Sequence, residues 1–586
     1  MTRNLPTWLN GIIDPTRQRA LLTVATSLLV VAFLAQGFSA AVGNSMCNDE
    51  SKHIVTGWWL LQHREACLGI DNSPLTAVFA LPLLGDQLSL PRDAAETLNP
   101  HEAGYQLIFT APDPEWILLR ARAVMLLLGA CTVLLAGMLS RRLFGPAGQL
   151  LTVCLVAFDP NLIAHFSVVS TDALLVFTTI LYVVALDGFL RTPTRRGAAG
   201  VGICLGIALI AKYTSLVLLP ATGLLLPFYL ERLRKRPVKQ WGVDGCLALV
   251  AALAVVWVGY GAHITTAPPF LPIPGFLAGL GRVRSLAAHG MPSYLCGQVS
   301  TSWRSYFLYV LALKTPVPLL LLWGIAVVAG APGTRRAFLV PTFSVPALAA
   351  VFYTICLASD LNLGVRHMLP CYALMAIFTG GLAPWLVEAK RRSPVRALTG
   401  VLVLWLAGEA MWMGPHHLAY FNQFAGGPTG AIRYLGDSNL DWGQDLKRLR
   451  TVMDENGFEE AIVAYLGNTD PAFYGITYQC LPVMFYGSTN GDRVVSPQRE
   501  ILAVSTSNLQ GIHYDRPDPF AWLTERPPIA RAGYSIYLYD ITGDAAAHRE
   551  LAGIYAQFGM HGLQARELAK AGHPGRARNP RPSPLD

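Results

Sequence analysis

The sequence predicts a polytopic α-helical membrane protein that ends in an α/β domain outside the membrane. Three observations support this fold class. Charged residues make up only 14% of the 586 residues, whereas hydrophobic residues make up 53%. Apolar stretches of about 20 residues, the length of helix that spans a bilayer, recur as far as position 414. Beyond that position the pattern changes to short apolar strands and amphipathic helices.

The apolar stretches predict about eleven membrane crossings. They lie at 20–42, 117–139, 147–167, 172–190, 198–211, 213–230, 243–262, 306–329, 337–358, 368–387 and 397–414. The fifth and sixth stretches are short, and Lys212 lies in the turn between them. The first stretch ends in Ser39-Ala40-Ala41, which resembles a signal-peptide cleavage site, but the topology is consistent with a retained helix.

Basic residues set the expected orientation, because cytoplasmic loops collect Lys and Arg. One side of the predicted crossings holds Arg17 and Arg19, Arg141–Arg142, Arg191 with Arg195–Arg196, Arg232–Arg236, Arg335–Arg336 and Lys390–Arg392. The first loop on the other side, 43–115, contains ten acidic and three basic residues. We therefore expect residues 1–19 in the cytoplasm and, after an odd number of crossings in the domain 20–414, a C-terminal domain outside.

The C-terminal region 415–571 is expected to fold as a mixed α/β domain. Its pattern predicts helices at 443–456 and 545–558 and strands at 460–466, 501–505 and 534–539. The tail 572–586 contains Pro and Arg but few apolar residues, so we expect it to be disordered.

Several classes of function find no support in the sequence. It has no Cys/His cluster with zinc spacing, no phosphate-binding glycine loop, no dinucleotide fingerprint and no nucleophile elbow. The net charge of +8 follows from membrane topology, and no basic–aromatic pattern indicates a nucleic-acid partner. Cys47 and Cys67 share the first outer loop, where a disulfide is plausible, and Cys296 with Cys480 is an alternative pair.

The pair Asp49–Glu50 directly follows the first predicted crossing. An ionised carboxylate at this place is suited to take a proton from an acceptor hydroxyl that meets a lipid-borne substrate. The alternative interpretation is a pair of solvated loop acids, or acids that cap a short helix beginning near Ser51.

Two further polar positions, Asp172 and Lys212, are expected at the same outer surface. Asp172 opens the fourth crossing, where it is expected to serve as an N-cap and to hold a cationic partner beside the site. Lys212 lies at membrane depth, where a charge is costly and indicates function; snorkelling to the interface is the alternative.

Arg366 and His367 precede the tenth crossing, and Arg366 is an isolated cation on the outer side. Its planar guanidinium suits a phosphate, because it donates two hydrogen bonds at once. His367 either donates to the same phosphate or packs against its neighbours. Lys314, near the start of the eighth crossing, is a weaker phosphate-binding candidate of the same kind.

The run Asp437 to Asp445 invites comparison with a calcium loop, because Asp437, Asn439 and Asp441 alternate. The match fails at the turn glycine, which is Trp442 here. We instead expect Asp441 to cap the following helix, with Gln444 three residues on. A divalent cation is the alternative, and no other cofactor is expected.

Taken in order, these motifs resemble the GT-C superfamily of polyprenyl-phosphate-dependent glycosyltransferases. Within it the chain is similar to the glycosyltransferase family 39 branch, related to protein O-mannosyltransferases and aminoarabinose transferases. The matching stretches are Asp49-Glu50, Ser170–Leu175, Ala211–Thr214, Lys314–Pro316, Gly364–Pro370, Tyr420–Asn422, Gly426-Gly427 and Asp437–Asp445. They cover about residues 20–450; one departure is Asn72-Ser-Pro-Leu75, where members often have His-Pro-Pro-Leu.

The resemblance implies a GT-C membrane fold in a bacterial inner membrane and an inverting transfer of sugar. The donor would be a polyprenyl-phosphate sugar, and the acceptor a hydroxyl of a protein, lipid or glycan on the outer face. Asp49 maps onto the base, while Asp172, Lys212 and Arg366 map onto positions that line the central cavity. Two alternatives remain: a glycolipid transporter without chemistry, and an assembly factor in which Asp49 and Arg366 would lie far apart.

Overall fold

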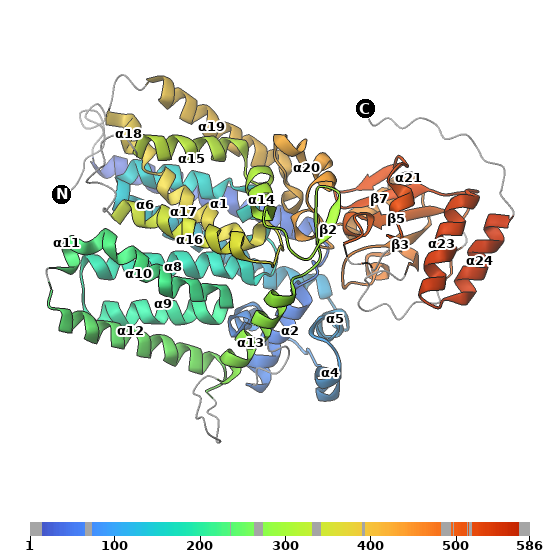
Figure 1. Cartoon of the computed structure of the whole chain (residues 1–586), viewed down its shortest axis with the longest axis horizontal. Coiled ribbons are helices and arrows are strands. Elements are labelled where there is room, and N and C mark those ends of the chain that lie inside the picture. The colour runs from blue at the N-terminus through green and yellow to red at the C-terminus, as the bar shows by residue number, and fades with distance from the viewer. Residues whose placement is uncertain are drawn as a thin grey trace.

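The computed structural model describes residues 15–64, 73–234, 236–262, 274–330, 341–388, 393–481, 494–495, 497–512, 514 and 518–572. Long helices lie side by side in one part of the molecule, and a smaller α/β part lies beyond one end of them (Figure 1).

The helices of the first part come in the following order. They are α1 Pro15–Gly43, α2 Glu50–His63, α3 Ala77–Ala80, α4 Arg92–Thr97, α5 Pro100–Phe109, α6 Pro114–Ala157, α7 Pro160–Phe166, α8 Thr171–Arg191, α9 Arg195–Ala211, α10 Leu218–Leu225, α11 Leu230–Leu233, α12 Val238–Gly259, α13 Pro274–His289, α14 Tyr306–Lys314, α15 Val317–Gly330, α16 Ser344–Ala358, α17 Leu369–Thr379, α18 Leu382–Glu388, α19 Ser393–Met413 and α20 Gly427–Gly430. Short 3₁₀ helices include η3 Tyr213–Val217, η7 Val365–Met368 and η12 Asp437–Asn439, and β1 Ser293–Leu295 pairs with β2 Gln298–Ser300.

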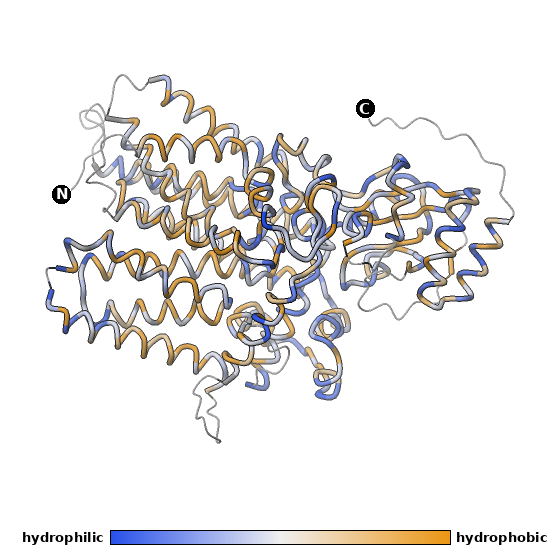
Figure 2. Tube along the Cα trace, viewed as in Figure 1, coloured by the Kyte–Doolittle hydropathy of each residue, from blue (hydrophilic) through white to orange (hydrophobic). Residues whose placement is uncertain are grey.

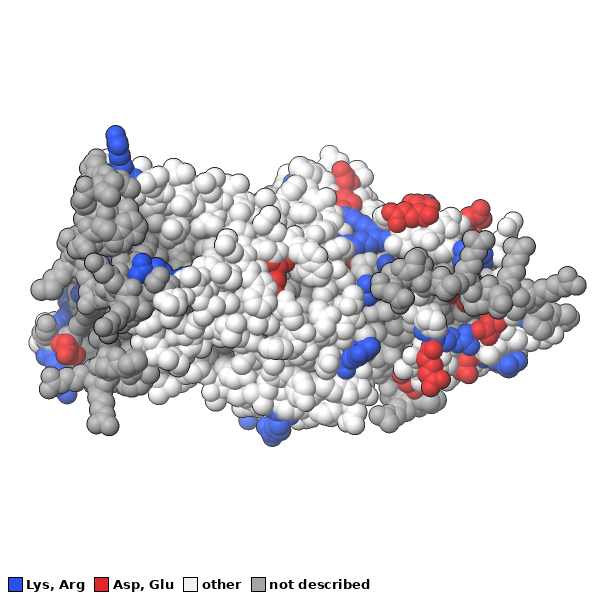
Figure 3. Space-filling view, turned by 90° about the horizontal axis from the view of Figure 1, so that it is seen from above, with Lys and Arg blue, Asp and Glu red and all other residues white. Residues whose placement is uncertain are grey.

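Six helices among the described residues are long and apolar enough to cross a membrane. They are Thr16–Gly43, Pro114–Ala157, Thr171–Arg191, Val238–Gly259, Val365–Leu386 and Pro394–Met413. Hydrophobic residues predominate along these helices in Figure 2. In Figure 3 the charged side chains gather toward the two ends of the molecule and are sparse between them. The chain is therefore a multi-pass membrane protein.

Two of the predicted crossings are broken into shorter helices in the structure. The predicted crossing at 306–329 is the pair α14 and α15, bent by 104°. The predicted crossing at 147–167 is divided between the end of α6 and α7, and α6 itself kinks at Gly145, which has φ 82° and precedes Pro146. Six spans, or seven if the bent pair is one, satisfy the test among the described residues, so the count of about eleven stays a prediction.

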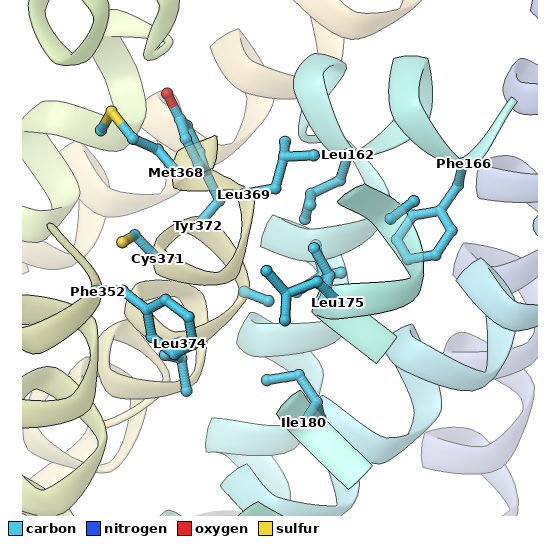
Figure 4. Packing of buried hydrophobic residues seen from close by; sticks show 14 of the residues in the cluster. Leu162, Phe166, Leu175, Ile180, Phe352, Met368, Leu369, Cys371, Tyr372 and Leu374 are labelled. Atoms are coloured by element: carbon cyan, nitrogen blue, oxygen red, sulfur yellow. The ribbon is translucent and has the colours of Figure 1, made fainter. Parts of the chain in front are cut away.

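The core of the bundle lies where α7, α8, α16 and α17 meet. Leu162 and Phe166 of α7, Leu175 of α8, Phe352 of α16 and Leu374 of α17 are buried there (Figure 4). This packing fixes the ends of α8 and α17, and therefore the positions of Asp172 and of the segment that leads into α17.

The α/β part contains one five-stranded sheet in the order β4-β3-β5-β7-β6. Its strands are β3 Glu460–Ala464, β4 Thr477–Cys480, β5 Ile501–Ser505, β6 Ala530–Ala532 and β7 Ile536–Asp540. Strands β4, β3 and β5 run parallel, and β7 and β6 pair antiparallel. The two predicted strands at 460–466 and 501–505 are confirmed as β3 and β5, and 534–539 is β7; β4 and β6 were not predicted.

Helices cover both faces of this sheet. Helix α21 (Leu446–Asn456) packs one face with Leu446, Leu449 and Met453, which confirms the predicted helix and its apolar stripe. Helices α23 (Ala545–Gln557) and α24 (His561–Gly572) cover the other face. Because β3 and β5 are covered on both sides, their sequences are continuous apolar runs.

Both disulfide expectations are wrong. Cys296 is a free thiol, which excludes the alternative bridge between Cys296 and Cys480. Cys47 is a buried free thiol, which excludes the predicted Cys47–Cys67 bridge. Cys67, Asn72 and the tail 573–586 lie outside the described residues, so the disordered tail stays a prediction.

A buried ion cluster joins α23 to α24. His548 of α23 is 1% exposed, and its Nδ1 lies 2.6 Å from Glu567 Oε2 of α24 while its Nε2 lies 3.0 Å from Glu500 Oε2. Lys570 Nζ lies 2.6 Å from Glu500 Oε1. Burial opposes the charge on the imidazole, but the two carboxylates raise the pKa of His548 to about 9.

This shift predicts a pH-dependent stability of the helix pair. The pKa of His548 is about 6.5 in an unfolded chain, so its stabilisation is complete below pH about 6.5 and is lost as the pH rises through about 9. At pH 6, His548→Gln should speed amide exchange in residues 545–572 by about tenfold or more, measured by mass spectrometry, and the difference should vanish near pH 10. The exposed His561 of α24 provides the control variant His561→Gln; an equal effect of His548→Gln at both pH values would contradict this assignment.

Candidate active site at the end of the helical bundle

Asp49 and Arg366 form an ion pair although they are 317 positions apart in the chain. Arg366 Nη1 lies 2.8 Å from Asp49 Oδ2, and the two side chains are 12% and 25% exposed. Asp49 immediately precedes α2, and Arg366 lies in η7 before α17. The guanidinium lies 5.1 Å from the ring centroid of Trp442, and its Nε donates to the Leu363 carbonyl. The sequence predicted both residues at one site, and the structure brings them into contact.

A second ion pair lies beside the first. Lys212 Nζ donates to Asp172 Oδ1, and the side chains are 20% and 6% exposed. Arg366 interacts electrostatically with both Asp49 and Asp172, so the four charges form one cluster. The prediction that Asp172 is the N-cap of α8 is wrong. Ser170 occupies that position, and its Oγ accepts from the Asp172 N–H. The carboxylate of Asp172 accepts from Lys212 Nζ and, at 3.3 Å, from Ser170 Oγ.

Asp49 remains ionised in spite of its burial. Desolvation opposes the charge, but the neighbouring cation Arg366, with contributions from His101, His53 and Lys52, holds the pKa of Asp49 well below its usual range. Burial lowers the pKa of His53 to about 4, although Asp49 opposes this shift, so the His53 imidazole is neutral at pH 7. The site therefore presents a carboxylate beside a neutral imidazole.

Glu50 and its neighbour Asp49 have different surroundings in the structure. Glu50 is 1% exposed and accepts from Arg122 Nε at 2.9 Å, from the Cys47 N–H at 2.8 Å and from the Val169 N–H at 2.8 Å. Arg122 of α6 also donates to the carbonyls of Asn44 and Ser45. This buried pair ties the start of α2 to α6 and to the segment before α8.

Arg122 was not singled out from the sequence. An arginine inside an apolar helix was the available signal, because a charge at that depth needs a partner. Its contacts place Arg122 and Glu50 beneath the Asp49 loop, and the Glu50 carboxylate is fully used by hydrogen bonds to protein.

Lys314 and His367 are placed differently from the ion-pair cluster. Lys314 is 1% exposed; its Nζ donates to the carbonyls of Leu418 at 3.2 Å and Asn439 at 2.7 Å and lies 4.5 Å from the Phe421 ring centroid. The ring of His367 is stacked against Phe307, with centroids 6.4 Å apart. Lys314 therefore connects α14 to the segments that contain Leu418 and Asn439.

The run Asp437–Asp445 hydrogen-bonds both loops of the candidate site. Asn439 Oδ1 accepts from the Val365 N–H at 3.0 Å, next to Arg366, and Trp442 O accepts from the Asn48 N–H at 2.9 Å, next to Asp49. Gly364 has φ 88°, and a Cβ there would lie 2.7 Å from Asn439 Oδ1, so this position requires glycine.

The expected helix cap in this run is wrong. Helix α21 begins at Leu446, and Asp445 precedes it, so Asp441 is not its N-cap. Asp441 instead accepts from the Gly443 and Ser507 N–H groups. Within the described part of the chain, no group of three His, Cys, Asp or Glu residues is arranged to hold a metal ion.

The buried pair predicts a stability defect. Glu50→Gln leaves the Arg122 charge without its carboxylate, which should cost about 3 kcal/mol, because breaking a buried pair strands the other ion. Thermal unfolding of the purified protein in detergent measures this loss. Glu96→Gln, at an ion pair whose side chains are 65% and 71% exposed, is the matched control and should change little. Equal melting temperatures for the two variants would contradict the structural role of Glu50.

Part of the chain matches the model of a known protein family. Residues 117–260 match the family model of the dolichyl-phosphate-mannose-protein mannosyltransferases. This segment includes α8, α9 and α12, and thus Asp172 and Lys212. A search of curated proteins found no match.

Three solved structures are similar to the chain. ArnT from Cupriavidus metallidurans bound to undecaprenyl phosphate has 14% sequence identity and a TM-score of 0.46, over 88% of this chain and 97% of that one. The apo state of the same protein gives 15% and 0.44, over 90% and 98%. The Archaeoglobus fulgidus oligosaccharyltransferase tethered with an acceptor peptide gives 13% and 0.38, over 74% and 57%. Over residues 117–260, about a quarter of its length, the chain is thus similar to the dolichyl-phosphate-mannose-protein mannosyltransferases.

Proposed function

We propose that this glycosyltransferase moves a sugar from a polyprenyl-phosphate donor to an acceptor hydroxyl of a protein, lipid or glycan. The transfer inverts the anomeric carbon, and it takes place on the outer face of a bacterial inner membrane with Asp49 as the base. The observation that supports this proposal most is the contact of Asp49 with Arg366, 2.8 Å apart. A carboxylate suited to accept a proton and a cation suited to bind phosphate are thus partners in one ion pair.

The Asp49–Arg366 pair suggests how donor and base are coupled. A donor phosphate needs the Arg366 guanidinium, which in this structure donates to Asp49. Phosphate binding therefore competes with Asp49 for the same group. When Arg366 turns to the phosphate, the pKa of Asp49 rises toward its usual value, because its strongest cationic neighbour is now neutralised. A carboxylate released in this way is a stronger base toward the acceptor hydroxyl.

The chemistry then proceeds by displacement at the anomeric carbon. Asp49 takes the proton of the acceptor hydroxyl, the hydroxyl oxygen bonds to the anomeric carbon, and the bond to the phosphate oxygen breaks on the opposite face. Arg366 and Lys212 stabilise the negative charge that develops on the leaving phosphate. A phosphate monoester leaves as a stable anion, so no separate general acid is needed.

The other predicted site residues receive positioning roles in this proposal. Asp172 holds Lys212 through their ion pair. Glu50 fixes the Asp49 loop through its ion pair with Arg122. Lys314 fixes the segment around Asn439, because its Nζ donates to the Asn439 carbonyl. His367, stacked on Phe307, shapes the wall of the site beside Arg366.

The first prediction concerns the base. Asp49→Asn cannot accept a proton, so transfer should fall by about 100-fold or more. Release of lipid phosphate from a panel of radiolabelled polyprenyl-phosphate sugars, tested with the wild-type enzyme to find the donor, measures this loss. Asp93→Asn, in the exposed first turn of α4, is the control for charge in the same loop. Near-normal turnover of Asp49→Asn would exclude Asp49 as the base.

The second prediction concerns competition for Arg366. Arg366→Gln should weaken binding of undecaprenyl phosphate by about 10- to 100-fold, the worth of charge-assisted hydrogen bonds. Asp49→Asn should tighten binding instead, because it frees the guanidinium. In the double variant Asp49→Asn/Arg366→Gln the tightening should disappear, which a double-mutant cycle of dissociation constants detects. Weaker binding to Asp49→Asn alone would contradict the competition.

A further inference from the structure

Asn468 lies in the turn after β3 and connects the α/β domain with the loop that contains Asp49. Its side chain is buried, at 1% exposure. Asn468 Nδ2 donates to the carbonyl of Asn48, the residue before Asp49, and lies 2.9 Å from Nδ1 of His101 in α5. Three parts of the chain that are far apart in the sequence therefore meet at one side-chain amide.

The turn that presents Asn468 is fixed by hydrogen bonds of its own. Tyr465, directly after β3 and 2% exposed, accepts from the Thr469 N–H at 2.8 Å through its hydroxyl, which also donates to the Thr469 carbonyl. A Cβ on Gly467 would lie 2.3 Å from Tyr465 Cε2, so the turn closes over the ring only because this residue is glycine. The fold of the α/β domain thus sets the position of Asn468.

His101 is held firmly on the other side of the contact. It is the second residue of α5, and Asn99 Oδ1 caps that helix by accepting from the His101 N–H at 3.0 Å. Helix α5 packs closely on α2, because a Cβ on Gly104 would lie 2.2 Å from the Ser51 carbonyl oxygen. Since Asp49 immediately precedes α2, this packing places His101 beside the Asp49 loop.

The contact with Asn468 determines which nitrogen of His101 carries the proton. An amide nitrogen has two N–H donors and cannot accept. The Asn48 carbonyl accepts one N–H, and the contact of 2.9 Å with the other requires that His101 Nδ1 accept. The proton of a neutral His101 is then on Nε2. A proton on Nδ1, directed at the Asn48 carbonyl 3.1 Å away, would instead set two N–H groups against each other.

The state of His101 bears on Asp49, because the two groups interact electrostatically. With its Nδ1 lone pair occupied and its proton on Nε2, a neutral His101 is a donor and does not compete with Asp49 as a base. The anchored Asn48 carbonyl also restrains the backbone directly before Asp49. Such restraint matters for rate, because misplacing a reacting group by about 1 Å can cost about 100-fold.

We propose that Asn468 is a positioning residue for the transfer: it anchors the Asn48 carbonyl and keeps the proton of His101 on Nε2. This inference rests on the proposed function, in which Asp49 is the base. The α/β domain, which lies outside the family match over residues 117–260, thus contributes to the geometry of the reacting carboxylate.

The first test locates the proton of His101 and needs no turnover. The full-length protein, labelled with nitrogen-15 histidine and placed in lipid, is measured by solid-state NMR above about pH 8, where an ordinary imidazole is neutral. His101→Gln identifies the His101 signals. We expect an unprotonated Nδ1 in the wild type. In Asn468→Asp the new carboxylate only accepts, so the proton should move to Nδ1.

The second test separates transfer from donor binding. In Asn468→Asp, and in the uncharged Asn468→Leu, kcat should fall by about 10- to 100-fold. The Kd of undecaprenyl phosphate should not change, because both variants retain Arg366 and Lys212. Asn456→Asp, which alters an exposed asparagine at the end of α21 in the same domain, is the matched control and should leave kcat unchanged.

The two tests give results that support or overturn the proposal. An unprotonated Nδ1 in the wild type, together with a lower kcat at unchanged Kd in the Asn468 variants, supports it. A protonated Nδ1 in the wild type overturns it, as does a normal kcat in both Asn468 variants. A loss of undecaprenyl phosphate binding in step with kcat would indicate general disruption and also overturns it. If Asp49→Asn retains turnover, the proposed base is wrong, and the NMR signals still decide the contact of Asn468 with His101.

Discussion

The ion pair between Asp49 and Arg366 depends on three separate parts of the chain meeting at one point. Asp49 follows α1 and Arg366 precedes α17, and neither helix alone fixes the distance between them. Beneath the Asp49 loop, the buried Glu50–Arg122 pair anchors the start of α2 to α6. On the opposite side, Trp442 covers the Arg366 guanidinium at 5.1 Å. An opposite charge at this separation compensates for the desolvation of each ion, so both remain charged in a mostly buried site.

This arrangement gives the segment Asp437–Asp445 a central position. It hydrogen-bonds the loop before α17 through Asn439 and the loop before α2 through Trp442, and it continues into α21 of the α/β domain. A displacement of the α/β domain would therefore be transmitted to Asp49, the proposed base, and to Arg366, the proposed phosphate-binding residue, together. The edge of β3 and β5 contacts the same loop through Asn468.

Much of the fold and of the site could be predicted from local sequence. Length and apolar character predicted the strongest spans, and periodicity predicted α21, β3, β5 and α23. Asp49, Asp172, Lys212 and Arg366 could be grouped because each charged residue borders an apolar stretch, where charge is costly. Topology then placed them on one surface, which is where the structure brings them together.

What could not be predicted depends on contacts between distant residues. Glu50 and Asp49 are neighbours in the chain but have different partners. Glu50 is held in the interior by Arg122, 72 residues away, and the local sequence does not reveal that contact. The role of Asn439 depends on its hydrogen bond from the Val365 N–H. Position 364 requires glycine because Asn439 packs against it, which the sequence alone does not show. The caps at Asp172 and Asp441 were wrong by a few residues, because several polar residues near a helix start compete for the same N–H groups.

A structure of the chain bound to undecaprenyl phosphate tests the coupling of base and donor most directly. The account predicts that the Arg366 guanidinium has left Asp49 and donates to the phosphate, with Lys212 on the same side and the Asp49 carboxylate free to accept the proton of the acceptor hydroxyl. A phosphate bound elsewhere, with the Asp49–Arg366 pair intact, would contradict it.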